Sequence, residues 1–307
     1  MGENLLMRKK ILSLLCFWIG FSIVLTIVCI PFQPLKKLGN QYLDVIERTQ
    51  NLACEKENTM DVLFLGDSIP WAGISPLRMY AQDKITVYNC STSGQRVMDS
   101  AAILQRALRY QKPQAVVLDV NSVFTRIRPI KNSLEVFFPV FRYHDYYMKD
   151  FEKCGALDDW KGYTYADTIV PFDSGEYMIH SDVKWGKINR RFMDKIYSIC
   201  QKHSISLVLM ALPCPNSWNQ TKHDLIQKWA DTHKVKFLDL NSNGMVNVDS
   251  GTDYRDYGEH LNDTGATKCS YALSKYLKET YNLQEKTNQE YERAIEAVGV
   301  YGQDGLQ

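Results

Sequence analysis

The sequence predicts an α/β fold, with a mainly parallel sheet between layers of helices, preceded by one transmembrane helix. Short apolar runs with the character of buried strands alternate along the chain with amphipathic segments whose apolar residues recur at helical spacing. This alternation favours a parallel sheet, because the helix that joins two parallel strands must pack on a face of that sheet. A long uncharged stretch near the N-terminus predicts the membrane helix.

The membrane helix is expected over residues 11–32, ILSLLCFWIGFSIVLTIVCIPF, which contain no charged residue. A helix needs about 20 apolar residues to cross a bilayer. A cleaved signal peptide is the alternative, but the stretch is longer than the apolar region of such peptides and no small-x-small cleavage site follows it. We therefore expect an uncleaved anchor. Basic residues stand on both sides, at 8–10 and at Lys36 and Lys37, so charge gives only a weak preference for a cytoplasmic N-terminus at residues 1–10.

Five apolar runs and four amphipathic segments make up the expected α/β domain. The runs read as strands are residues 61–65, 87–89, 115–119, 206–211 and 236–238. The segments read as helices are residues 99–110, 185–202, 222–233 and 262–279.

Three segments do not follow this alternation of strands and helices. Residues 33–58 are polar and are expected to connect the anchor to the domain, with a helical portion around residues 42–52. Residues 125–180 form an insertion dense in aromatic residues, which either packs its own small core or forms a lid or sugar-stacking wall beside the functional site. Residues 286–307 are expected to form a loosely ordered polar tail.

Composition excludes several classes of function. A chain of 307 residues with 45% hydrophobic content can bury a substantial core, and its formal net charge of +1 suggests no polyanionic partner. No cluster of lysine and arginine exceeds three residues, so we expect no nucleic-acid binding. The eight cysteines form no CxxC pair and the histidines show no metal-ligand spacing, so neither a metal nor another cofactor is expected. Disulfide pairs cannot be assigned from the sequence.

Polar residues follow the predicted strands at the points where these end. Ser68 follows the first strand, NCSTSGQ at 89–95 the second and DVNS at 119–122 the third, while DYRDYGEHLNDTG at 253–265 precedes the last helix. Ligands of open α/β sheets bind beyond the carboxyl ends of the strands. The four stretches therefore predict one functional site at this edge of the sheet.

Four of these motifs resemble the blocks of the SGNH, or GDSL-type, hydrolase superfamily. They are LGDS at 65–68, NCSTSG at 89–94, Asn121 within DVNS, and HLN at 260–262. Each is weak alone, but together they occur in the family's order over roughly residues 60–280. The resemblance implies a three-layer α/β/α, flavodoxin-like domain over residues 59–285.

The resemblance also implies a serine-esterase mechanism. Ser68 would be the nucleophile and His260 the base that removes its proton, since a serine hydroxyl is a poor nucleophile without one. The backbone N–H groups of Ser68 and Gly94 and the side-chain amide of Asn121 would stabilise the oxyanion. Each residue also has a structural alternative: a turn or helix cap for Ser68, a strand-end amide for Asn121 and a helix cap or core histidine for His260. The four-block pattern favours the catalytic roles.

Two residues depart from the family's pattern. Asp119 replaces the glycine that usually stands two residues before Asn121, which we expect to restrict adjustment of that loop. Tyr257 stands three residues before His260, where the family usually has the aspartate of a triad. We predict that Asp256 orients His260, with Gly258 absorbing a one-residue bulge. Asp253, seven residues before His260, and a Ser–His pair without a carboxylate are the alternatives.

The anchor, the LFLGDS…ISP opening and the HLNDTGA ending together resemble bacterial envelope proteins that modify extracellular glycans or teichoic acids. This resemblance implies a single-pass protein of the cell membrane whose catalytic domain faces outward. Its substrates would be acyl esters of cell-envelope polysaccharide or teichoic acid, which it would hydrolyse or transfer beside a membrane-bound O-acyltransferase. Two other interpretations stay open: a lipid or short-chain esterase, and a catalytically impaired scaffold that binds glycan.

Overall fold

The computed structural model describes residues 2–30, 51–125, 138, 140, 158–173 and 175–300. The chain divides into two compact units: residues 1–43 with 128–153, and residues 44–127 with 154–307. Most of the predicted connector and much of the predicted insertion, including Phe137, Phe141 and Tyr143, lie outside the described residues.

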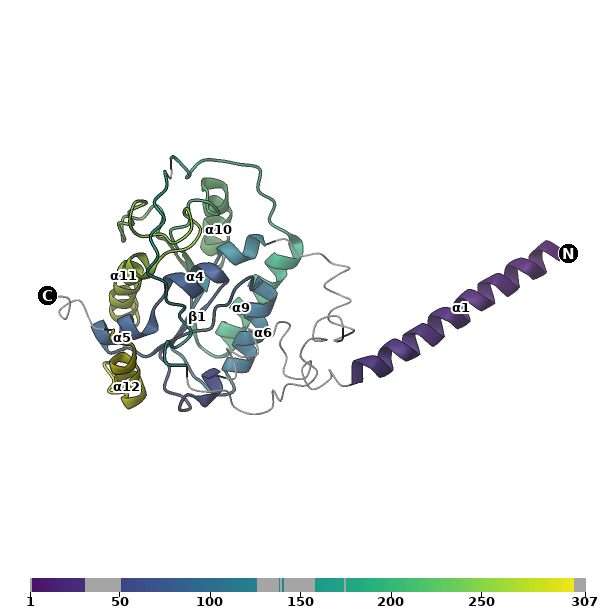
Figure 1. The fold of residues 1–307 in the computed structure, drawn as a ribbon, viewed down its shortest axis with the longest axis horizontal. Helices are drawn as coiled ribbons and strands as arrows, with labels where there is room; N and C mark the ends of the chain where they lie inside the picture. The colour runs from purple at the N-terminus through teal and green to yellow at the C-terminus, as the bar shows by residue number, and fades with distance from the viewer. Residues whose placement is uncertain are drawn as a thin grey trace. The chain divides into compact units, whose positions relative to one another are not determined.

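The first unit contains helix α1 (Gly2–Cys29) (Figure 1). Within it, Met7–Cys29 is long and apolar enough to cross a membrane, a property that a signal sequence near an N-terminus shares. The helix therefore fits the predicted anchor over residues 11–32, and both its retention and its orientation stay predictions.

The second unit is built on a five-stranded parallel sheet. Its strands are β1 (Val62–Leu65), β2 (Val87–Asn89), β3 (Ala115–Asp119), β4 (Ser206–Ala211) and β5 (Lys236–Asp239). The order is β2-β1-β3-β4-β5 and every pair is parallel. The predicted fold class is confirmed, and each predicted strand lies within one residue of the observed one. The order reverses at β1, so loops that follow the strands diverge there and leave room for a ligand.

Helices cover both faces of this sheet. Helices α5 (Pro76–Asp83) and α11 (Asp263–Tyr281) lie on one side of β1, and α6 (Val97–Ala107) and α9 (Lys187–Lys202) on the other (Figure 1). Helix α10 (Gln220–His233) packs beside β5. Strands covered on both faces are apolar at successive positions rather than alternating, which is why all residues of β1, β2 and β3 are buried.

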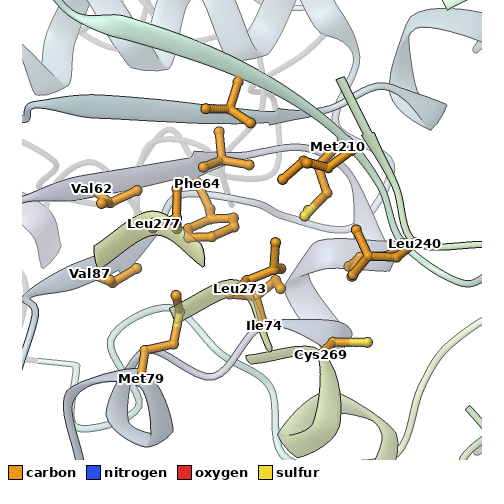
Figure 2. Close-up of a cluster of buried hydrophobic side chains, with 14 of the residues drawn as sticks. Val62, Phe64, Ile74, Met79, Val87, Met210, Leu240, Cys269, Leu273 and Leu277 are labelled. Atoms are coloured by element: carbon orange, nitrogen blue, oxygen red, sulfur yellow. The ribbon is translucent and has the colours of Figure 1, made fainter. Parts of the chain in front are cut away.

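The core between the sheet and α11 shows how the layers join. Val62 and Phe64 of β1 and Met210 of β4 pack against Leu273 and Leu277 of α11 (Figure 2). All five side chains are fully buried. Side chains alternate across a strand, so the intervening residues of β1 face the opposite layer. This two-sided packing holds the carboxyl ends of the strands rigidly at one edge.

Three α-helices in the described part of the chain were not predicted. Helix α4 (Ser68–Gly73) has six residues and α5 has eight, too few for a clear periodic pattern, and each carries a proline in its first turns. Helix α12 (Gln289–Val298) corrects the prediction of a loose tail from residue 286. Tyr291 of α12 is fully buried, and its hydroxyl donates to the Val87 carbonyl at 2.5 Å. Asn288 caps the helix by accepting from the N–H groups of Glu290 and Tyr291.

Candidate active site

The side chains of Ser68, His260 and Asp256 form a continuous chain of hydrogen bonds. His260 Nε2 lies 2.7 Å from Ser68 Oγ, and His260 Nδ1 lies 2.5 Å from Asp256 Oδ2. A carboxylate can only accept, so it fixes the histidine tautomer with the proton on Nδ1. Nε2 is then left as the acceptor for the serine proton. This is the arrangement of a nucleophile, its base and the carboxylate that orients the base.

Ser68 is placed by a tight turn between β1 and α4. A Cβ on Gly66 would lie 2.4 Å from Pro70 Cγ and 2.8 Å from Asp119 Cβ, so no larger residue fits in this turn. Asp67 caps α4, because its Oδ1 accepts from the Ile69 N–H at 3.0 Å. Ser68 is thus the first residue of a helix that begins directly beyond the strand.

Helix α4 is in turn fixed to the neighbouring strand. Asn89, the last residue of β2, donates from its buried amide to the carbonyls of Pro70 at 2.8 Å and Ile74 at 3.1 Å. The asparagine that opens the NCSTSG motif therefore holds α4 at its third residue and at the residue that follows its last turn.

His260 and Asp256 approach each other because the loop between them folds back. Tyr257 and Gly258 have φ values of +55° and +91°, in the left-handed region. Asp256 Oδ1 accepts from the backbone N–H of His260 at 2.6 Å, and the Arg255 N–H donates to the His260 carbonyl at 3.1 Å. The carboxylate therefore holds both the backbone and the ring of His260.

Asp253, the alternative acid, makes other contacts. Its fully buried carboxylate accepts from Lys268 Nζ at 2.6 Å, from the Asp249 N–H at 2.8 Å and from Thr252 Oγ1 at 2.8 Å. These bonds join the preceding turn to α11. The structure thus places Asp256, rather than Asp253, against His260.

The two other residues predicted for the oxyanion site follow the strands on either side of β1. Gly94 lies in the loop after β2 with a φ of +66°, and among the described residues no atom outside Gly94 and its two chain neighbours lies within 4 Å of the place a Cβ would take. Asn121 begins the short 3-10 helix η2 (Asn121–Phe124) directly after β3. Because β2 and β3 both pair with β1, their loops flank the turn that carries Ser68. The structure therefore brings all the predicted site residues to one edge of the sheet.

Asp119, two residues before Asn121, holds the start of the loop that carries Asn121. It is fully buried, and it accepts from the backbone N–H groups of Asn121 at 3.0 Å and Leu212 at 3.4 Å. Burial raises the pKa of Asp119 well above its ordinary value, and the nearby Asp67 carboxylate raises it further. Asp67 keeps some solvent exposure but is enclosed by protein groups, and this desolvation raises its pKa to about 6.

Lys222 is a residue of the site that sequence reasoning missed. Its Nζ donates to Asn121 Oδ1 at 2.9 Å and also to the Ser217 carbonyl. Burial lowers the pKa of Lys222. The residue stands 101 positions from Asn121 and belongs to no motif, so no signal in one sequence indicates it.

The described part of the aromatic insertion runs along the same edge of the sheet. The Thr164 N–H donates to the Trp71 carbonyl of α4 at 3.0 Å, the Val170 N–H to the Tyr254 carbonyl at 2.9 Å, and the Gln220 N–H of α10 to the Ile179 carbonyl at 3.1 Å. Phe172 packs edge-on against Tyr254, with ring centroids 5.0 Å apart. Between residues 164 and 182 the chain forms no helix or strand in its described part, and it crosses from α4 to α10.

Over the described ranges, no three or more histidine, cysteine, aspartate or glutamate side chains are grouped so that they could hold a metal ion.

The chain is similar in structure to GDSL-type lipases, acylhydrolases and esterases. No family model matches it, and no curated protein does. Similar solved structures include a GDSL-like lipase from Bacteroides thetaiotaomicron, at 13% identity and a TM-score of 0.42, covering 76% of this chain and 95% of the other. A lipase/acylhydrolase from Enterococcus faecalis shares 14% identity at a TM-score of 0.39, and the match covers 75% of this chain and 100% of the other. A carbohydrate acetylesterase family member from Sinorhizobium meliloti shares 10% identity at a TM-score of 0.39, and the match covers 73% of this chain and 100% of the other. These identities and TM-scores are too low to assign an activity to the chain.

Proposed function

We propose that this protein is a serine esterase or O-acyltransferase of the SGNH type, anchored in the membrane with its catalytic domain outside the cytoplasm. The observation that carries the proposal is the hydrogen-bonded chain from Ser68 through His260 to Asp256, at the carboxyl edge of a parallel sheet. A scaffold that only binds glycan has no need of a base held 2.7 Å from a serine hydroxyl.

The first half of the reaction forms an acyl-enzyme. His260 Nε2 takes the Ser68 hydroxyl proton as Oγ attacks the ester carbonyl carbon, and the carbonyl electron pair moves onto oxygen. The Asp256 carboxylate stabilises the imidazolium that forms. The resulting oxyanion is stabilised by the backbone N–H groups of Ser68 and Gly94 and by Asn121 Nδ2. When the intermediate collapses, the alcohol leaves with the proton from His260.

The second half frees the enzyme by the same steps. Water or a sugar hydroxyl gives its proton to His260 and attacks the acyl carbon. The second oxyanion collapses, and Ser68 Oγ leaves with the proton. Attack by water gives hydrolysis, and attack by a sugar hydroxyl gives acyl transfer.

One observation supports the membrane anchor, and another supports an extracytoplasmic position for the domain. The N-terminal helix is long and apolar enough to span a membrane, with the catalytic unit following it in the chain. Cys54 is disulfide-bonded, a state that is typical of oxidising compartments outside the cytoplasm. Protease treatment of intact cells should therefore digest the domain. Protection in intact cells, with digestion only after lysis, would reverse this topology.

We propose acyl esters of cell-envelope glycans or teichoic acids as substrates, with a membrane-bound O-acyltransferase as a neighbour. Exposed tyrosines at the same edge support a carbohydrate substrate: Tyr257, adjacent to Asp256, is 67% exposed, and Tyr165 is 47% exposed and stacks on Trp160. Aromatic rings that present a flat apolar face and a polar group suit sugar rings.

A substrate panel tests this assignment. We would compare acetylated oligosaccharides with p-nitrophenyl acetate and with long-chain p-nitrophenyl esters in micelles, using Ser68→Ala as the matched inactive variant. Preference for acetylated oligosaccharides supports the proposal. Preference for long-chain esters would instead assign a lipid esterase.

A further inference from the structure

We propose that Lys222 is a positioning residue that orients the side-chain amide of Asn121, with its nitrogen directed at the oxyanion. The inference rests on the proposed function and adds to it a residue from outside the four sequence motifs.

The contacts of Lys222 fix where its ammonium group lies. Lys222 is the third residue of α10, and its backbone N–H is bound at 3.0 Å by Oδ1 of the capping residue Asn219. Nζ donates to Asn121 Oδ1 at 2.9 Å and to the Ser217 carbonyl, and it lies 5.3 Å from the centroid of the Phe124 ring. Phe124 and Asn121 belong to the same 3-10 helix. The half-buried lysine therefore links the start of α10 to the segment that carries the amide.

The chemistry of the two groups determines which way the amide faces. An ammonium group donates three hydrogen bonds and accepts none, so the Asn121 atom that contacts it must be the oxygen. The amide is planar, and both hydrogens of Nδ2 are then directed away from Lys222. Among the residues that the structure describes, none accepts a hydrogen bond from Nδ2. The donor is thus free to bind a substrate oxygen.

Lys222 completes the positioning of Asn121. The backbone N–H of Asn121 is already held by Asp119 Oδ1 at 3.0 Å, which leaves rotation of the terminal amide to be fixed. In asparagine this rotation is broad and roughly two-fold, so without a partner the oxygen could face the substrate instead. An oxygen in that place would repel the oxyanion. A cation on the amide oxygen also polarises the amide and strengthens Nδ2 as a donor.

A double-mutant cycle separates this role from a merely structural one. We would measure kcat and KM for p-nitrophenyl acetate and the melting temperature of the full chain for wild type, Lys222→Met, Asn121→Ala and the double variant. Loss of an oriented donor should lower kcat about 10- to 100-fold in Lys222→Met with KM little changed, which is less than the loss when the donor itself is removed. In the Asn121→Ala background, Lys222→Met should lower kcat by less than about twofold, because no amide remains to be oriented.

Two further variants serve as controls. Lys222→Arg keeps a cationic donor and should recover most of kcat. Lys228→Met removes an exposed lysine from the same helix and should leave kcat unchanged. An equal loss of kcat from Lys222→Met in both backgrounds, or no loss in either, would overturn the proposal.

A readout without turnover separates this inference from the proposed function. If wild type and Ser68→Ala turn over esters equally slowly, the proposed function is wrong, and the cycle has no activity to measure. In that case we would record the side-chain amide resonance of Asn121 in full-length protein labelled with ¹⁵N-asparagine. This resonance is identified by its loss in Asn121→Asp, and its position tests whether Lys222 contacts the amide. We expect it to shift in Lys222→Met and not in Lys228→Met. The same resonance position in wild type and Lys222→Met would overturn the inference.

Discussion

Replacing Asp256 with asparagine tests the base of the proposed mechanism. The two oxygens of Asp256 accept from the ring Nδ1–H and from the backbone N–H of His260. In Asp256→Asn, the amide oxygen can keep the backbone hydrogen bond, but the amide nitrogen then faces Nδ1. Since that nitrogen can only donate, Nδ1 must become the acceptor and the ring proton moves to Nε2. A protonated Nε2 cannot take the Ser68 proton.

The expected loss follows from this tautomer and from the exposure of Asp256. In a buried triad, the wrong tautomer lowers kcat by about 10⁴-fold. The Asp256 side chain is 40% exposed, so water can take over part of the contact with the ring. We therefore expect kcat to fall by about 10²- to 10³-fold, or about 3 to 4 kcal/mol of transition-state stabilisation, with KM little changed.

The assay compares Asp256→Asn with Asp253→Asn. Both are measured for p-nitrophenyl acetate turnover per folded molecule, with thermal melts to follow folding. Asp253 binds Lys268 and the preceding turn, so its variant should lower the melting temperature and leave turnover nearly unchanged. A large loss of turnover in Asp253→Asn with little change in Asp256→Asn would refute the reasoning. Little change in both would instead favour a Ser–His pair without a carboxylate.

Three further predictions follow from individual contacts. Asn121→Ala should lower kcat by about 100- to 1000-fold at an unchanged melting temperature, because it removes one donor to a charge present only in the transition state. Gly258→Ala should lower both kcat and melting temperature, because Gly258 has a φ of +91° and a Cβ there would lie 2.6 Å from the Phe172 ring. Asp67→Asn should flatten the pH dependence of stability, measured by urea unfolding between about pH 4 and about pH 7.

The sign of the Asp67 prediction follows from its pKa, which rises from 3.8 to about 6 in the folded protein. Between these values the native state binds more protons than the unfolded state, so stability falls as the pH rises and then levels off above pH 6. The free energy of unfolding that is lost amounts to at most about 3 kcal/mol, and this loss is absent in Asp67→Asn. The same change in the free energy of unfolding with pH in both proteins would contradict the Asp67 prediction.

For Asn121→Ala, normal turnover with a lowered melting temperature would assign a structural role. An active, stable Gly258→Ala would show that the loop tolerates a side chain.

The sequence predicted the sheet well because its strands are buried on both faces. β2, β3 and β4 lie at the predicted positions, since continuous apolar runs mark strands covered by helices. The short helix α4 gave no comparable signal. Helix α12 did carry a helical signal, since Tyr291, Ala294, Ile295 and Val298 recur at helical spacing, but the polar composition of the tail predicted a loose segment instead.

The candidate site was predictable where a motif marks it. The motifs pointed to Ser68 and His260, and proximity in the sequence pointed to Asp256. How Asp256 reaches the ring depends on two successive left-handed residues, and a non-glycine such as Tyr257 gives no sign of adopting that conformation. Lys222 could not be predicted, because its contact with Asn121 arises only in the folded domain, where α10 packs beside β5 and the start of α10 meets the 3-10 helix that carries Asn121.

The most direct test of the acyl-enzyme mechanism is reaction of the full-length protein with a fluorophosphonate probe, followed by mass mapping of the labelled peptide. Such probes bond to a serine whose hydroxyl is activated by a base. The mechanism predicts one label, on Ser68, that is lost in Ser68→Ala and strongly reduced in His260→Ala. Labelling of a different serine, or no labelling of a preparation that hydrolyses p-nitrophenyl acetate, would contradict it.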